Sequence, residues 1–200
     1  VCPVEQTGKR IAIVGGGPAG IGAAAVCASR GHEVVIFEKL GVVGGDACTI
    51  PEFRLPRHTL EEDIEFLKAL GNVKIEMDRK ITDPEALLRE DGFDAVGVTV
   101  GLSEDKLLGF PGEEHAMKAR QYLRAKPDMG TNVAVIGGGP VAVDCATTAL
   151  RNGAKNVTIF YRRSQPEMPV DGADREIIQK FGVEVMGRHV PTRIEVNAEG

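Results

Sequence analysis

Two glycine-rich turns are the segments of this sequence best suited to bind a phosphate-bearing cofactor. In a G-x-G-x-x-G turn the first glycine makes the tight bend, the second lets the backbone approach a pyrophosphate, and the third lets helix and strand pack closely. The anion then accepts hydrogen bonds from free N–H groups at the helix N-terminus. The candidate phosphate-binding residues are Gly15, Gly17, Pro18, Ala19 and Gly20 in a first copy, and Gly137, Gly139, Pro140 and Val141 in a second copy.

The residues that follow each copy differ in charge. Glu38 stands about 20 residues after the first turn, where a carboxylate accepts hydrogen bonds from an adenosine ribose, and Lys39 beside it belongs to the same candidate set. Aligning the two copies puts Tyr161 at the position of Glu38, with Arg162 and Arg163 directly after it. A carboxylate repels a 2′-phosphate, whereas arginine binds one. The second site is therefore predicted to take NADP(H) rather than NAD(H).

Two dinucleotide sites with opposite charges indicate an electron relay within one chain. The acidic site suits the adenosine end of FAD, and the arginine-bearing site suits NADP(H). In such a relay a hydride passes from the nicotinamide to the flavin, so the cofactors supply the chemistry and the protein positions them. We therefore expect no catalytic side-chain acid or base.

The elements that position these turns follow from the repeat itself. Residues 11–38 and 133–161 each read as a β-branched run, a glycine turn, a helix of small residues, a second glycine turn and another β-branched run, which is a βαβ unit. Further predicted elements are a helix capped by Thr59 and Glu62 and ending near Leu70, a strand Val73–Met77, a helix from Pro84 to about Glu90, a buried strand Phe93–Val100, a helix Asp174–Lys180 and a strand Val183–Met186.

Alternation of strands and helices predicts an α/β fold with a mostly parallel sheet. The expected architecture is two Rossmann-like dinucleotide-binding βαβ units, the second of them incomplete. We expect an FAD-binding domain over residues 1–110 and a partial NADP(H)-binding domain over residues 111–200, joined within the Pro- and Gly-punctuated stretch 106–130. A full dinucleotide domain needs more strands than the second part supplies, so the chain is expected to be a segment of a larger protein.

The chain resembles the small (beta) subunit of glutamate synthase and the homologous N-terminal flavin half of dihydropyrimidine dehydrogenase, from about Gly8 to Val185. The motifs that carry this resemblance are Val43-Gly44-Gly45, Ile50-Pro51-Glu52-Phe53-Arg54-Leu55-Pro56, Asp144-Cys145-Ala146, Tyr161-Arg162-Arg163-Ser164 and Glu167-Met168-Pro169. The resemblance implies an NADPH domain inserted into an FAD domain. It also implies an iron–sulfur domain or subunit and a larger catalytic subunit as partners.

Site residues also follow from the resemblance. It implies that Gly44, Gly45 and Arg54 lie along FAD and that a backbone group near Ile81 contacts it. The family's Ala-Thr-Gly flavin turn falls on residues 99–101, where valine replaces the threonine and Gly101 is retained. The family's N-terminal iron–sulfur domain makes Cys2-Pro3 a conceivable remnant, but one cysteine cannot hold a cluster and an incidental cysteine is favoured.

Charge and composition disfavour several other classes. The 24 basic and 29 acidic residues give a net charge of −5, which argues against nucleic acid or an anionic membrane as the main partner. The apolar stretch 11–28 is interrupted by glycines and a proline, so no membrane span is predicted. The four cysteines show no C-x-x-C spacing, which favours a reducing, cytoplasmic setting, and the four scattered histidines predict no metal site.

Two other functions remain open at this level. One is a different flavoprotein with two nucleotide sites, such as a ferredoxin–NADP reductase or a peroxide-type NADH oxidase; the other is a nucleotide-binding sensor or scaffold without turnover. A disulfide reductase is disfavoured, because the position that would hold the redox partner of Cys48 is Phe53. Cys48 is therefore interpreted as a small apolar residue.

Overall fold

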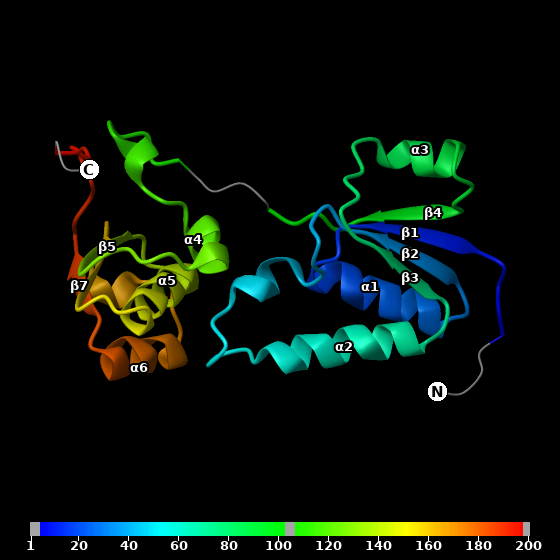
Figure 1. Ribbon diagram of the computed structural model, residues 1–200, viewed down its shortest axis with the longest axis horizontal. Coiled ribbons are helices and arrows are strands. Elements are labelled where there is room, and N and C mark those ends of the chain that lie inside the picture. Colours follow the sequence, from blue (N-terminus) through cyan, green and yellow to red (C-terminus); the bar gives the residue numbers. More distant parts are fainter. Residues whose placement is uncertain (1–4, 103–106, 198–200) are drawn as a thin grey trace. The chain divides into compact units, whose positions relative to one another are not determined.

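Two compact units, residues 1–103 and 104–200, make up the chain in the computed structural model (Figure 1). The structure describes residues 5–102 and 107–197, so the conceivable Cys2-Pro3 remnant lies outside the described residues. Each unit contains a parallel sheet with helices packed on it, which confirms the predicted α/β class.

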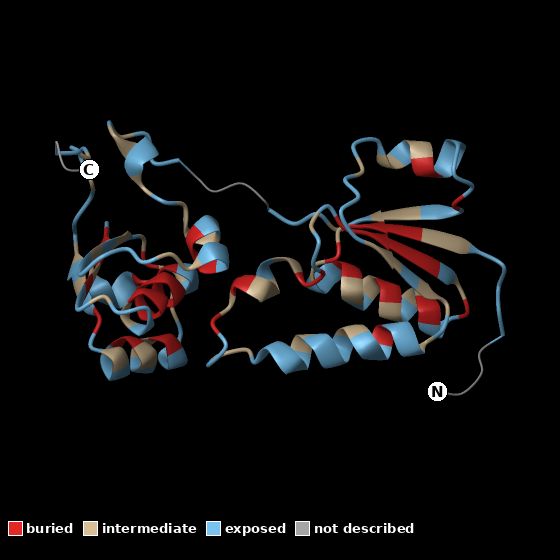
Figure 2. Ribbon diagram, viewed as in Figure 1, coloured by how far each residue is buried: buried red, intermediate tan, exposed pale blue. Residues whose placement is uncertain are grey.

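The first unit is built on a four-stranded parallel sheet of strand order β3-β2-β1-β4. The two central strands are the buried ones (Figure 2), because both their neighbours and the helices shield them from solvent. Its elements are β1 (Arg10–Val14), α1 (Pro18–Ser29), β2 (Glu33–Phe37), the 3-10 helix η1 (Gly45–Thr49), α2 (Arg57–Ala69), β3 (Val73–Glu76), α3 (Pro84–Arg89) and β4 (Ala95–Val98).

Both faces of this sheet carry an apolar core, since side chains of a strand alternate between its two sides. On one face Ile13 and Ile36 pack with Leu67 and the alanines of α1, and on the other Phe37 packs with Leu87 of α3. Helices α1 and α2 therefore cover one side of the sheet and α3 the other (Figure 1). Runs such as Val34–Phe37 are buried on both faces, which explains why they are continuously apolar.

The second unit repeats this plan on a three-stranded parallel sheet of order β5-β6-β7. Its elements are the 3-10 helix η2 (Glu113–His115), α4 (Ala119–Ala125), β5 (Asn132–Ile136), α5 (Pro140–Arg151), β6 (Asn156–Tyr161), the 3-10 helix η3 (Gln165–Glu167), α6 (Gly172–Phe181) and β7 (Glu184–Gly187). One face, with Val157 and Ile159, packs against α4, α5 and α6.

The two sheets differ at one edge. In the first unit β1 pairs with both β2 and β4, whereas within the described residues its counterpart β5 pairs with β6 alone. The sheet face opposite the core carries Ile136 and Met186, each 37% exposed, and the half-buried Phe160. Over the described residues, the sheet of the second unit therefore has one strand fewer than that of the first.

Two local predictions are wrong. The expected capping box of Thr59 and Glu62 does not form, because α2 already begins at Arg57 and Pro56 stands at its N-cap, where a ring-fixed φ suits the entry to a helix. The strand expected over residues 93–100 is shorter and more exposed than predicted. It covers Ala95–Val98 at the edge of the sheet, and Val98 is 58% exposed because no further strand pairs with it in the described part of the chain.

Other elements follow their sequence signals. Asp83 caps α3 by accepting hydrogen bonds from the N–H groups of Glu85 and Ala86, and Pro84 occupies the first helical position. Helix α6 begins at Gly172, just ahead of the predicted start, because the Asp171 carboxylate accepts a hydrogen bond from the Asp174 N–H. Helix α4 has no counterpart among the predicted elements.

Candidate dinucleotide-binding sites

The first glycine turn connects β1 to α1 under tight steric limits. The Gly15 N–H donates to the carbonyl of Phe37 over 2.8 Å, which ties the turn to the end of β2. A Cβ on Gly15 would lie 2.5 Å from the carbonyl oxygen of Thr99, and one on Gly20 would lie 2.0 Å from that of Gly15. Larger residues therefore cannot replace either glycine without moving the backbone, which is the role assigned to them from the sequence.

The N-terminus of α1 is open toward a ligand. Gly17 is the N-cap and has no side chain to cap the helix, Pro18 follows it, and both Pro18 and Ala19 are exposed. The first N–H groups of a helix have no partner within it, and its dipole favours an anion there. This geometry fits a pyrophosphate, because no side chain of the described residues caps the helix.

Glu38 lies buried beside this turn, with 5% of its surface exposed. One carboxylate oxygen accepts a hydrogen bond from the Gly16 N–H over 2.8 Å, and the other accepts one from the Leu40 N–H over 2.9 Å. Each carboxylate oxygen has a second lone pair, so the fixed carboxylate can still accept hydrogen bonds from ligand hydroxyls. Two neighbouring hydroxyl groups of a ribose match this arrangement.

The loop carrying Gly44 and Gly45 packs directly against the first glycine turn, residues 15–20, which is called the fingerprint from here on. The Gly44 N–H donates to the Gly16 carbonyl over 2.7 Å, and a Cβ on Gly45 would lie 2.9 Å from the Cα of Gly17. Cys48 turns its thiol to the Val43 carbonyl over 3.3 Å, so it serves the loop's own structure. The structure thus brings together Glu38, the glycine pair and the fingerprint, which are separate in the sequence.

The remaining candidates of the first unit lie on loops around this centre. Lys39 is exposed and Arg54 is half-buried just before α2. The side chain of Ile81 packs into the core on the α3 side of the sheet, so only its backbone is available to a ligand. Its loop reaches the site because the Arg79 N–H donates to the Glu38 carbonyl over 2.8 Å. Gly101 is exposed after β4.

Thr99 is a site residue that sequence reasoning missed. Its hydroxyl lies 2.8 Å from the Gly15 carbonyl and 3.1 Å from the Val14 carbonyl, so it holds the fingerprint turn in place from β4. The family resemblance did place residue 99 in a flavin turn, but it gave the threonine side chain no role. A threonine beside the fingerprint is, however, detectable only once β4 is paired with β1.

The second glycine turn repeats the first with changed side chains. The Gly137 N–H donates to the Phe160 carbonyl over 3.0 Å, as Gly15 does to Phe37, so Tyr161 stands at the position of Glu38. This confirms the alignment made from the sequence. A Cβ on Gly138 would lie 2.3 Å from the Tyr161 ring, whose hydroxyl donates to the Glu167 carbonyl.

The helix that follows the second turn is also open at its start. Gly139 is the N-cap of α5 without a side-chain cap, and the next residues, Pro140 and Val141, are exposed. Arg162 and Arg163 are exposed at the end of β6. Hydrogen bonds from the hydroxyl and the N–H of Ser164 hold the pKa of Glu167 below its ordinary value, and the Arg163 guanidinium acts in the same direction.

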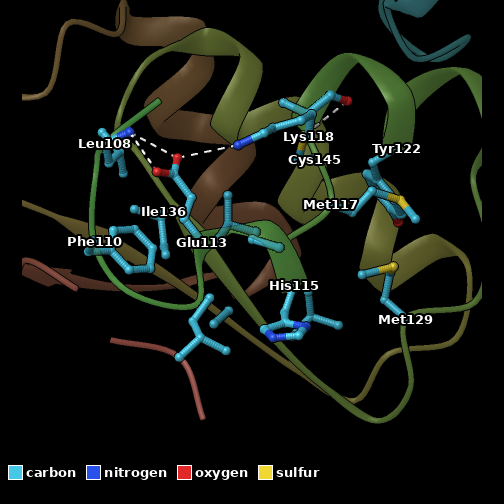
Figure 3. A pocket seen from close by; sticks show the side chains of 16 residues that line it. Leu108, Phe110, Glu113, His115, Met117, Lys118, Tyr122, Met129, Ile136 and Cys145 are labelled. Carbon is cyan, nitrogen blue, oxygen red and sulfur yellow. Dashed lines mark hydrogen bonds and ion pairs between the residues drawn. The ribbon is translucent and has the colours of Figure 1, made fainter. Parts of the chain in front are cut away.

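A cavity of about 450 Å³ also lies in the second unit (Figure 3). It opens beside β5, between that strand and the segment carrying Phe110, His115 and Met117. Its lining is mainly apolar. None of the candidate nucleotide-binding residues of this unit lines the cavity.

The described ranges hold no membrane-spanning helix, metal-binding cluster or disulfide. No helix in residues 5–102 or 107–197 has the length and apolar character needed to cross a membrane. The same residues contain no group of three or more side chains placed to hold a metal ion. Their cysteines, Cys27, Cys48 and Cys145, form no disulfide with one another.

Comparisons with known proteins agree with this geometry. The family model of pyridine nucleotide-disulphide oxidoreductases matches residues 9–199. The chain is 38% identical to the NADPH-Fe(3+) oxidoreductase subunit beta of Geobacter sulfurreducens, covering 98% of this chain and 31% of that protein. It is 33% identical to the glutamate synthase [NADPH] small chain of Escherichia coli K12, covering 98% of this chain and 46% of that protein. The chain thus spans less than half the length of these relatives.

Solved structures share the fold at lower identity. The thioredoxin reductase of Lactococcus lactis matches with a TM-score of 0.71 at 23% identity, covering 94% of this chain and 67% of that one. A 2-naphthoyl-CoA reductase matches with a TM-score of 0.81 at 20% identity, covering 96% of this chain and 30% of that one. On the family match and on these relatives, the chain belongs to the pyridine nucleotide-disulphide oxidoreductase family and, as its motifs indicated, resembles the small chain of glutamate synthase.

Proposed function

We propose that this chain is the electron-input module of an NADPH-dependent flavin oxidoreductase of the glutamate synthase small-chain type. The observation that carries the proposal is the pair of equivalent positions after the two glycine turns. One holds the buried Glu38 carboxylate, and the other holds Tyr161 followed by two exposed arginines. Two copies of one nucleotide-binding plan with opposite charges suit two different nucleotides.

The first unit binds FAD in this proposal. Its open helix N-terminus faces the pyrophosphate, and the fixed Glu38 carboxylate accepts the ribose hydroxyls. Gly45 packs so closely on Gly17 that a Cβ there would lie 2.9 Å from the Gly17 Cα, and the pair thereby places its backbone beside the proposed pyrophosphate position. Lys39, Arg54, Gly101 and the backbone near Ile81 complete the proposed set.

The second unit binds NADP(H). Gly137, Gly139, Pro140 and Val141 supply the pyrophosphate turn, and Arg162 and Arg163 bind the 2′-phosphate. When both cofactors are bound, NADPH supplies a hydride to the flavin, and no side chain of this chain has to carry a proton. Electrons then leave for iron–sulfur centres on another domain or subunit and reach a larger catalytic subunit. The names of the relatives, "subunit beta" and "small chain", support such an assembly.

An anaerobic titration tests this function directly. The protein is reconstituted with FAD, and the flavin absorbance is followed during addition of NADPH or of NADH. We expect NADPH to bleach the flavin at lower concentration than NADH does. A preparation that cannot be reconstituted with FAD, or a bound flavin that neither nucleotide reduces, would contradict the proposal.

Replacing Arg162 by alanine should weaken NADPH binding about ten- to a hundredfold and leave NADH binding nearly unchanged. A hydrogen bond to a charged group contributes about 1.5–3 kcal/mol, and only the 2′-phosphate of NADPH receives it. Isothermal titration with both nucleotides measures the effect. Lys155→Ala is the matched control, because Lys155 is an exposed cation at the opposite end of β6. Equal losses for NADPH and NADH in the Arg162 variant would refute the assignment.

A further inference from the structure

We propose that Arg188 is a third determinant of nucleotide specificity and binds the 2′-phosphate together with Arg162 and Arg163. The inference rests on the proposed function and adds to the arginine pair at the end of β6 the residue that directly follows β7. It depends on how the end of β7 packs against the end of β6.

The backbone places Arg188 next to the arginine pair. Its N–H donates to the Arg163 carbonyl over 2.7 Å, and the N–H of His189 donates to the Tyr161 carbonyl over 3.0 Å. Gly187 permits this approach, because a Cβ there would lie 2.9 Å from the Gln165 nitrogen and 3.0 Å from the Arg163 oxygen. The long side chain of Arg188 therefore starts at the same turn that carries Arg162 and Arg163.

The first unit contains the same arrangement with the opposite charge. There the Asp78 N–H donates to the Leu40 carbonyl and the Arg79 N–H donates to the Glu38 carbonyl. Because Glu38 and Tyr161 are equivalent, so are Leu40 and Arg163, and Asp78 and Arg188 occupy one position in the two copies. Both have left-handed backbone, with φ of 56° at Asp78 and 62° at Arg188.

The charge at the position shared by Asp78 and Arg188 changes between the two units, as does the charge of the residues that follow β2 and β6. In the first unit Glu38 is accompanied by Asp78, and in the second unit the arginine pair is accompanied by Arg188. Left-handed backbone is rare for residues other than glycine, asparagine and aspartate, so arginine is an unusual choice there. Strained positions of this kind concentrate at functional sites, and a phosphate ligand accounts for retaining the cation.

The three guanidinium groups also lack partners that would neutralise them. Arg162, Arg163 and Arg188 are all exposed, and none forms an ion pair with a carboxylate in the described ranges, although Glu167 lies near enough to Arg163 to feel its charge. Arginines elsewhere, such as Arg79 and Arg89, pair with glutamate or aspartate. Three exposed cations whose backbones meet at one turn are complementary to a dianionic phosphate.

Binding of two adenosine probes tests the role of Arg188 in the full chain. Adenosine 2′,5′-bisphosphate carries the 2′-phosphate and 5′-AMP does not. We expect Arg188→Gly to weaken the bisphosphate about three- to tenfold, which allows for solvent screening, and Arg188→Asp to weaken it more. Binding of 5′-AMP should stay unchanged, and Arg188→Gly should melt no lower than wild type because glycine suits this backbone. Arg193→Ala, an exposed arginine that pairs with Glu195, is the control.

The outcomes separate this inference from the proposed function. If both Arg188 variants bind the bisphosphate as wild type does while Arg162→Ala is weakened, the role of Arg188 is overturned and the NADP(H) site stands. Equal weakening of both probes in Arg188→Gly would mark a merely structural role and would also overturn the inference. A wild-type chain without preference for the bisphosphate over 5′-AMP would overturn the NADP(H) assignment itself.

Discussion

A Gly20→Ala variant is expected to lose FAD binding and to lower the free energy of unfolding by about 1–3 kcal/mol. The added methyl group would lie 2.0 Å from the Gly15 carbonyl oxygen and 2.9 Å from the Thr99 hydroxyl. The first contact is to backbone, so the clash is relieved only by moving α1 away from β1. That movement displaces the helix N-terminus from the pyrophosphate. Chemical denaturation and flavin fluorescence titration measure the two effects.

A matched substitution in the same helix isolates this cause. Gly22 also lies in α1, but a Cβ there would meet nothing within 4 Å. Gly22→Ala should therefore stabilise the chain by about 0.5–1 kcal/mol through helix propensity and leave FAD affinity intact. The second unit carries Ala142 at the equivalent position, where its Cβ lies 3.8 Å from a Cβ built on Gly137. Wild-type affinity in Gly20→Ala would show that the contact is not limiting.

Glu38→Ala should weaken FAD binding about ten- to a hundredfold and cost about 1–3 kcal/mol of stability. The carboxylate is the acceptor for the Gly16 and Leu40 N–H groups, and truncation leaves the buried Gly16 donor without its partner. The same truncation removes the acceptor for the ribose hydroxyls. Equilibrium dialysis with FAD and a parallel unfolding titration separate the loss of affinity from the loss of stability.

Two further variants divide the roles of this carboxylate. Glu38→Gln keeps one carbonyl acceptor but turns an amide donor toward a backbone N–H, so it should recover only part of the affinity. Glu33→Ala removes an exposed carboxylate at the start of the same strand, whose ion pair with Arg10 spans 3.5 Å. It should change stability by less than about 0.5 kcal/mol. FAD affinity that survives in Glu38→Ala would argue against a ribose contact at this residue.

Sequence alone predicts the parts of this molecule whose signals are local. Both glycine turns are recognised because each lies between a β-branched run and a small-residue helix. The alignment of the two copies makes Tyr161 the equivalent of Glu38. The start of α3 at Pro84 is equally local. Each of these features depends on residues a few positions apart, so the chain does not need to be folded for them to be recognised.

Features that depend on pairing between distant segments could not be predicted in the same way. Thr99 reaches the fingerprint only because β4 pairs with β1, and Arg188 reaches the arginine pair only because β7 pairs with β6. The exposure of Val98 follows from the edge position of β4, which an apolar run does not reveal. The start of α2 was missed because a proline at the N-cap competes with a plausible capping sequence that begins three residues later, at Thr59.

Among the residues that the structure describes, β5 pairs with a strand on one side only. A strand without a neighbour on one side presents backbone donors and acceptors that recruit strands from other molecules. Here that edge adjoins an apolar cavity and a sheet face bearing Ile136 and Met186, so intermolecular strand addition would also bury apolar surface. Aggregation of these 200 residues should therefore begin at β5, and a lysine introduced on that edge should improve the yield of monomer.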